Sequence, residues 1–237
     1  STFLQNKNHF SSGKVVVGLI IVFGALAVSA VRAQRSPMAE ILYRMDNHNR
    51  NLTSLRSNVT MDKTDSTVQA TDRYEGTTSY LPESFAGKMF VRIDWSKPAV
   101  ENMVVIGSQY KLYRPKLKQV IQGTTSGAKN AGAAGGALAF IGMSREKLKE
   151  LYDVVFIAKE AVGGVSAFHL QLTPKTKTSY KIAELWVDND GMPILAKVTE
   201  KNNDITTVLL TNIQKNVKIP ESFFTLDLPK DVKIVKG

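Results

Sequence analysis

The chain has 237 residues, a formal net charge of +10 at pH 7 and no cysteine. This length is sufficient for one domain with a large core, and the lack of cysteine excludes disulfides, thiol catalysis, cysteine-ligated metals and a lipidated N-terminal cysteine. The positive charge favours anionic membrane surfaces or acidic partners, although ordinary solubility explains it equally well.

Residues 1–33 have the pattern of a secretory signal peptide. A polar stretch with Lys7 and Lys14 is followed by an apolar run over 15–30 and by Val-Arg-Ala at 31–33. This order predicts export and cleavage after residue 33. The alternative is an uncleaved membrane anchor, but a spanning helix needs about 20 apolar residues, and this run is shorter and contains glycines. We therefore expect residues 34–237 to form the mature domain.

Residues 37–56 are expected to form an amphipathic helix. Ser36 supplies a capping hydroxyl, and Pro37 fits the first helical position because its missing N–H is not needed there. Apolar residues then recur on one face at helical spacing, namely Ile41, Leu42, Met45, Leu52 and Leu55.

A period of two indicates that strands follow. Val91, Ile93 and Trp95 lie on one side of the first of them, and similar segments occur at 103–106, 110–113, 120–121, 154–158, 168–173, 180–187, 194–198 and 205–213. Asn189-Asp190-Gly191 is typical of a hairpin turn, and a last extended segment is expected around Phe223 and Phe224. The fold class is therefore mainly β with covering helices, built on a single antiparallel sheet that is strongly curved or closed.

The middle of the chain interrupts this pattern. Residues 123–136 are rich in Gly, Ala and Thr and predict a loop, and residues 137–141 are abruptly apolar. Ser144 is expected to cap a short helix that runs through Leu151.

Motifs of enzymes are absent from the sequence. It contains no Gly-x-Ser-x-Gly, no His-Glu-x-x-His, no paired-carboxylate motif and no phosphate-binding Gly-Lys-Ser/Thr. We therefore expect no catalysis, no cofactor, no metal site and no nucleic-acid binding. Arg114, Lys116 and Lys118 form a basic strip that either contacts phosphates or protects a strand edge from pairing.

Several segments, in this order, resemble the LolA family of periplasmic lipoprotein carriers. Residues 87–98 (GKMFVRIDWSKP) are similar to a family strand that ends in Trp before a proline, and residues 109–120 (QYKLYRPKLKQV) to a segment with Tyr-x-Pro and a terminal Gln-Val. Residues 172–175 (LTPK) and 223–235 (FFTLDLPKDVKIV) also match family patterns. The resemblance covers about residues 38–235.

The resemblance implies an unclosed β-barrel whose apolar concave face is covered by helices. It also implies a monomeric periplasmic carrier that takes acylated lipoproteins from a releasing transporter in the inner membrane to an acceptor at the outer membrane. Such a carrier is needed because each acyl methylene exposed to water costs about 0.8 kcal/mol. An empty apolar concavity invites aggregation, so a helical lid is expected, with 37–56 and 137–151 as the candidates.

The lining of this cavity is expected to come from strands and from covering segments. The candidates are Val91, Ile93, Trp95, Phe168, Leu170 and Trp186 from strands, and Leu42, Met45, Leu138, Phe140 and Ile141 from the covers. Alternation identifies a buried face without saying what it faces, so plain core packing is the alternative for each of them.

One family feature has no counterpart in this sequence. The arginine that holds the lid in the family precedes a proline six residues before the Trp, where this chain has Met89. Arg92 is close but lies on the opposite strand face, so the arginine-dependent closure is not transferred. The alternatives to a lipoprotein carrier are a half-barrel for another amphiphile, a lipid-sensing regulator of the envelope, a non-lipid interaction module and an exported hydrolase.

Overall fold

The computed structural model describes residues 36–125, 140 and 142–237. The chain separates into two units, Ser1–Gln34 and Arg35–Gly237, and all described residues belong to the second. The expected signal peptide, most of the Gly-rich loop, Leu138 and Ile141 lie outside the described residues. Within the described part of the chain, no helix is long and apolar enough to cross a membrane.

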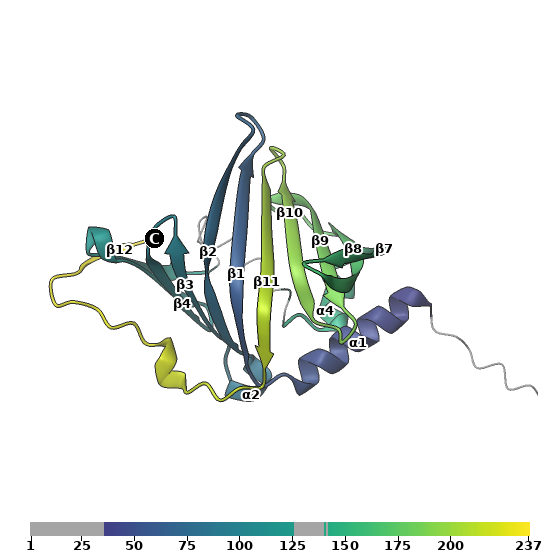
Figure 1. The fold of residues 1–237 in the computed structure, drawn as a ribbon, viewed down its shortest axis with the longest axis horizontal. Coiled ribbons are helices and arrows are strands. Elements are labelled where there is room, and N and C mark those ends of the chain that lie inside the picture. Colours follow the sequence, from purple (N-terminus) through teal and green to yellow (C-terminus); the bar gives the residue numbers. More distant parts are fainter. Residues whose placement is uncertain (1–35, 126–139, 141) are drawn as a thin grey trace, which may run out of the picture. The chain divides into compact units, whose positions relative to one another are not determined.

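One large sheet dominates the domain (Figure 1). Its strands in chain order are β1 (Leu55–Asp65), β2 (Ala70–Leu81), β3 (Phe90–Lys97), β4 (Glu101–Ile106), β5 (Gln109–Arg114), β6 (Gln119–Thr124), β7 (Tyr152–Val162), β8 (Val165–Pro174), β9 (Tyr180–Asp188), β10 (Pro193–Glu200), β11 (Ile205–Lys215) and β12 (Lys233–Lys236). Their spatial order is β12-β6-β5-β4-β3-β2-β1-β11-β10-β9-β8-β7. Neighbouring strands are antiparallel, but β12 runs parallel to β6.

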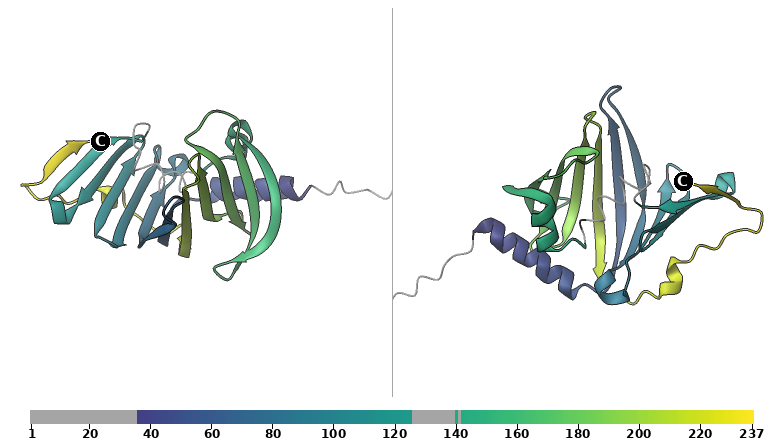
Figure 2. Two further views of the ribbon diagram at one scale, coloured as in Figure 1. Left: turned by 90° about the horizontal axis from the view of Figure 1, so that it is seen from above. Right: turned by 180° about the vertical axis from the view of Figure 1, so that it is seen from behind.

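The sheet is curved and unclosed, as Figure 2 shows from two further directions. β12 and β7 are its two edges. This confirms the expected single, curved, mainly antiparallel sheet. The parallel strand β12 was not expected, because residues 233–236 are too few to show a period of their own.

Short helices connect and cover these strands. They are α1 (Pro37–Asn51), α2 (Glu83–Ala86) and α4 (Arg145–Leu151), with the 3₁₀ helices η1 (Pro115–Leu117) and η2 (Glu221–Phe224). The Ser36 hydroxyl accepts a hydrogen bond from the Ala39 N–H at 3.2 Å, and Ser144 caps α4 in the same way through Lys147, so both expected caps are confirmed.

The expected helix over 37–56 is too long. The helix ends at Asn51, because Leu52 adopts an extended conformation and the Thr53 N–H donates to the Asn216 side-chain oxygen at 2.8 Å. Leu55 is fully buried as the first residue of β1. The segment around Phe223 is η2 rather than an extended piece.

The strand register separates the sheet into two faces. Residues paired across antiparallel strands point to the same side. Ile93 therefore shares a face with Met103. At the other end of the sheet, Leu170 shares a face with Leu185, which in turn pairs with Ala196. Following the register across β3, β2, β1 and β11 joins these two groups. We call this side the apolar face; its buried members include Val59, Met61, Val91, Ile93, Trp95, Met103, Val105, Leu170, Leu172, Leu185, Ala196, Val208 and Leu210.

A smaller cluster lies on the other side of the sheet. Phe90 and Val104 belong to the alternate positions of β3 and β4, and they pack with Leu81, Ile219 and Phe224. The ring centroids of Phe90 and Phe224 lie 5.3 Å apart. This cluster attaches the segment after β11 to the face opposite the apolar face.

Candidate functional site

Most of the expected lining residues come together in one hydrophobic cluster. Phe168 is half-buried and packs against it. The other members are at most 6% exposed, namely Leu42, Met45, Val91, Ile93, Trp95, Phe140 and Leu170. The cluster joins α1 and residue 140 to strands from both halves of the sheet, which are far apart in the sequence.

Trp186 is 9% exposed and belongs to the same cluster, but the register places it on the other face of the sheet. It pairs with His169, whereas Leu170 pairs with Leu185. The Trp186 ring stacks on the His169 ring with 4.1 Å between centroids, and its indole N–H donates to the Glu160 carboxylate at 2.6 Å. Trp186 is thus separated from the face that carries Leu170, and we exclude it from the site.

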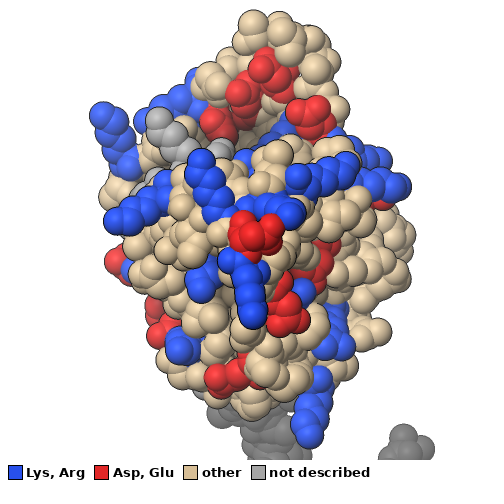
Figure 3. All heavy atoms as spheres, turned by 90° about the vertical axis from the view of Figure 1, so that its left-hand side faces the viewer, with Lys and Arg blue, Asp and Glu red and all other residues tan. Residues whose placement is uncertain are grey.

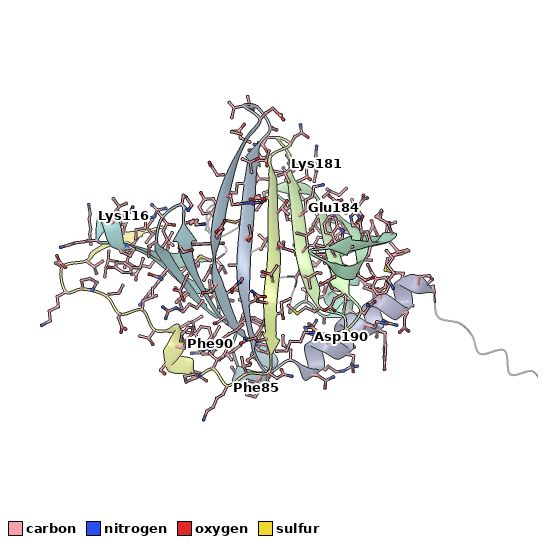
Figure 4. All side chains as sticks on the ribbon, in the orientation of Figure 1. Phe85, Phe90, Lys116, Lys181, Glu184 and Asp190 are labelled. Carbon is pink, nitrogen blue, oxygen red and sulfur yellow. The ribbon has the colours of Figure 1, made fainter. Side chains whose placement is uncertain are left out.

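The neighbourhood of Trp186 is a polar network. His169 lies 2.9 Å from Glu160 and 3.1 Å from Glu184, and Lys197 lies 2.9 Å from Glu184. Figure 4 labels Glu184 within this part of the sheet. These contacts place His169 on the polar side of its strand.

α1 packs on the apolar face at the end that carries β7 to β10. Ile41, Leu42 and Met45 are at most 2% exposed, and the Arg44 guanidinium lies 5.8 Å from the centroid of the Phe168 ring. These side chains lie on one stripe of the helix, as their spacing predicts. α1 therefore covers part of the apolar face.

Polar contacts at the rim fix α1 in this place. The Arg44 guanidinium donates to the Asn189 carbonyl at 3.0 Å, and the Asn49 amide donates to the Met143 carbonyl at 2.7 Å. Gly191, with φ +92°, lets the β9–β10 turn approach the helix backbone, because a Cβ there would meet the Arg44 carbonyl and lie 2.6 Å from the Met45 nitrogen. Sequence patterns did not reveal these contacts, since each pairs a common polar residue or glycine with a distant backbone.

Arg92 holds a different part of the molecule. Its guanidinium lies 2.8 Å from the Asp94 carboxylate, donates to the Phe223 carbonyl at 2.7 Å and covers the Phe223 ring at 4.7 Å. It therefore fastens the segment after β11 to the sheet, and it lies on the face opposite Ile93, as expected.

Residue 140 joins the aromatic side chains of the apolar face. The ring of Phe140 lies 5.9 Å from that of Tyr152, whose hydroxyl shares a 2.6 Å hydrogen bond with the Tyr180 hydroxyl. Burial, and then the hydrogen bond to Tyr152, raises the pKa of Tyr180, and burial raises the pKa of Tyr80 to about 12. Burial therefore disfavours ionisation of the Tyr180 and Tyr80 hydroxyls.

A cavity of about 540 Å³ opens beside α1. Its lining combines polar residues of the helix with apolar and aromatic residues of the sheet side; the residues are Asp46, Asn49, Arg50, Leu52, Tyr80, Pro82, Glu83, Met89, Gly142 and Ser144. A hollow lined by both polar and apolar residues suits a ligand that has both polar and apolar parts.

His48 is a buried histidine of α1 whose environment opposes charge. It is 7% exposed, and its Nε2 has no hydrogen-bond partner among the described residues. Burial, followed by the charge of Lys215, lowers its pKa from 6.5 to about 4, although Asp188 and Asp190 act in the opposite direction. Figure 4 labels Asp190 next to α1. His48 is therefore neutral at pH 7.

Sequence reasoning missed several members of the apolar face. Met61, Met103, Leu185, Val208 and Tyr80 are buried in the same cluster. A signal was present in β1, where residues 55, 57, 59 and 61 alternate with exposed or half-buried positions. Ser57, a polar residue on the buried side of the strand, interrupts the apolar pattern.

The fold and this site define a class of proteins. In this class, helices cover the apolar face of an unclosed, mainly antiparallel sheet. The sequence model of the family described as outer membrane lipoprotein carrier protein LolA matches residues 89–227, which is more than half of the chain. The chain therefore belongs to the LolA family. A comparison with curated proteins found no match.

Solved structures with a similar fold have low sequence identity. An uncharacterised conserved protein from Thermus thermophilus is 12% identical, with a TM-score of 0.54, and the match covers 85% of this chain and all of the other. A structure of MucB is 16% identical, with a TM-score of 0.50, over 79% of this chain and 62% of MucB. A LolA superfamily protein from Nitrosomonas europaea is 16% identical, with a TM-score of 0.41, over 78% of this chain and 96% of the other. This chain therefore spans less than two thirds of the MucB chain.

Proposed function

We propose that this protein binds the acyl chains of lipoproteins between its apolar face and its covering helices, and carries them across the periplasm from the inner to the outer membrane. The observation that carries the proposal is the continuity of the apolar face, which extends from Met103 on β4 to Leu170 on β8. α1 covers it at one end through Ile41, Leu42 and Met45.

The energetics favour this use of the apolar face. Exposing an acyl chain to water costs about 0.8 kcal/mol per methylene. A lipoprotein therefore leaves the membrane only if another apolar surface covers its acyl chains. The proposal takes the apolar face as the concave one, so that acyl chains enter between sheet and helices. The proposed lining is Leu42, Met45, Val91, Ile93, Trp95, Phe140, Phe168 and Leu170, with Leu138 and Ile141 as further candidates.

The proposed route requires export and two partners. Residues 1–33 would direct the chain to the periplasm and be cleaved there, because a carrier must diffuse between membranes. A releasing transporter in the inner membrane would load it and an outer-membrane acceptor would unload it, since a carrier between two membranes needs a donor and an acceptor. The catalytic role of any residue is not part of the proposal.

The test is uptake of an environment-sensitive apolar dye and its displacement by an acylated lipoprotein. Phe140→Glu places a charge within the proposed cavity and should abolish uptake, since a buried unpaired carboxylate repels apolar ligands. Val155→Glu is the matched control, because Val155 is 50% exposed and its partner Gln171 lies on the opposite face from Leu170. Circular dichroism verifies that both variants are folded.

One result would change the proposed site, and another would refute the carrier function. Dye uptake that is the same in Phe140→Glu, Val155→Glu and the parent would remove Phe140 from the site. Displacement of the dye by the protein part of the lipoprotein without its acyl chains would favour a protein-binding module over a lipid carrier.

A further inference from the structure

The β12 edge of the sheet exposes two large apolar side chains. Leu117 in η1 is 65% exposed and Ile234 in β12 is 58% exposed. Neither belongs to either hydrophobic cluster. Exposing such side chains in water is unfavourable, so a pair of them at one place indicates a surface that is covered in use.

The backbone pairing brings these two side chains close together. β12 runs beside β6 with Ile234 opposite Val120, three residues after Leu117. The Lys233 N–H donates to the Lys118 carbonyl at 2.8 Å, which joins η1 directly to the start of β12. Leu117 and Ile234 therefore belong to one patch.

Lysines surround this patch. Residues 115–119 and 229–237 contain Lys116, Lys118, Lys230, Lys233 and Lys236 but only one acid, Asp231, which pairs with Lys118 at 2.6 Å. Figure 3 views the molecule from the side where β12 lies in Figure 1, and many Lys and Arg side chains project from it. Figure 4 labels Lys116 at this edge of the molecule. We call Leu117, Ile234 and these five lysines the β12 patch.

Protection of the sheet edge does not account for the whole patch. Lysines on an edge strand deter pairing with another chain, which explains the charge. The same purpose disfavours exposed Leu and Ile, because apolar side chains promote association. A surface that combines apolar side chains with surrounding lysines instead suits an anionic membrane, where the apolar groups enter the interface and the lysines contact headgroup phosphates.

The opposite edge of the sheet supports this distinction. β7 also exposes apolar side chains, with Val155 50% and Ile157 48% exposed. Its charged residues, however, are Asp153, Lys159 and Glu160, so it offers no net positive charge. Only the β12 edge therefore combines both features among the two edge strands.

We propose that the β12 patch docks the protein on a membrane surface that contains anionic phospholipid, with Leu117 and Ile234 inserted at the interface. This surface lies at the opposite edge of the sheet from β7 and α1, so it is separate from the acyl site and does not depend on the proposed carrier function. Docking through this edge leaves α1 free to move.

The sequence contains no native cysteine, so one introduced cysteine can be labelled at a single defined site. In the full chain, Leu117→Cys accepts a single environment-sensitive fluorophore, and Val155→Cys gives the matched label on the opposite edge. Each protein is mixed with phosphatidylcholine vesicles, with or without phosphatidylglycerol at roughly a third of the lipid, that contain a lipid-attached quencher. A label at a defined site is required because the apolar residues 15–30 could bind vesicles by themselves.

The expected result is quenching of the label at position 117, but not at 155, by anionic vesicles alone. High salt should reverse it, since screening weakens exposed charges. Lys116→Gln and Lys233→Gln should each weaken binding about fivefold, in line with the usual contribution of a lysine near an anionic leaflet, whereas Lys147→Gln on α4 should not. Absence of quenching at 117 with anionic vesicles would overturn the proposal. Equal quenching at 117 and 155, or in neutral vesicles, would overturn it as well.

Discussion

Replacing Gly191 by alanine tests whether α1 is a docked cover or only a loosely attached helix. Gly191 has φ +92° and leaves no space for a Cβ against the backbone of Arg44 and Met45. Gly164 has φ +80° and no atom within 4 Å of a Cβ, so Gly164→Ala isolates the conformational cost. For an L-residue in this region the cost is about 1–2 kcal/mol.

The additional cost at Gly191 follows from the packing of α1. Ile41, Leu42 and Met45 each contribute about 2 kcal/mol by burial. Moving the helix outward by about 1 Å loses a quarter to a half of the attractive energy of these packing contacts. Gly191→Ala should therefore lose about 1.5–3 kcal/mol more than Gly164→Ala.

Urea denaturation followed by tryptophan fluorescence measures the free energy of unfolding of both variants. Apolar dye binding in the absence of urea provides a second readout, because a displaced α1 uncovers the apolar face. We expect Gly191→Ala to bind more dye than either Gly164→Ala or the parent. Equal stability and equal dye binding in the two variants would refute the conclusion that α1 is held against the sheet.

Three further predictions concern other parts of the structure. The pKa of His48 is about 4 in the folded protein against 6.5 in the unfolded chain, so the free energy of unfolding is highest above pH 6.5 and falls by about 2 kcal/mol at pH 5. His48→Gln should flatten this pH dependence in urea titrations. An unchanged slope would contradict the assignment. Ile93→Ala and Phe224→Ala should each lower the free energy of unfolding by about 3 kcal/mol or more. Only Ile93→Ala should change the affinity for the dye, because Phe224 lies on the other side of the sheet. A changed affinity in Phe224→Ala would contradict the separation of the sheet into two faces. Asn49→Ala removes the bond to the Met143 carbonyl and should increase amide hydrogen exchange in α1, whereas Asn51→Ala, whose side chain bonds only within the helix, should not.

The strands with clear alternation could be predicted from the sequence because the two sides of each strand differ. In β3, Val91, Ile93 and Trp95 are buried on the apolar face, while Arg92 bonds to the segment after β11 on the other side. The same argument identified Leu170 in β8. In such strands the local sequence shows which side chains are buried, since one face contacts the core and the other contacts polar groups.

Residues 185–187 show where alternation fails. Leu185, Trp186 and Val187 are all buried, because both faces of β9 are covered there. A continuous apolar run does not indicate which member points to which side. The register against β8 resolves it, and it moves Trp186 away from the expected lining.

The end of α1 could not be placed from periodicity alone. Leu52 and Leu55 continue the apolar stripe of the helix at the right spacing, yet Leu55 belongs to β1. The tertiary bond between Thr53 and Asn216, which are 163 positions apart, decides the boundary. The same reason explains why the contacts of Asn49 and Gly191 with distant backbone were not foreseen.

The most direct test of the account is equilibrium binding of one outer-membrane lipoprotein in two forms, acylated and unacylated, to the purified protein. The account predicts a one-to-one complex with the acylated form that is weakened strongly by Phe140→Glu, and no measurable complex with the unacylated form. Binding of both forms with equal affinity would contradict an acyl-chain carrier.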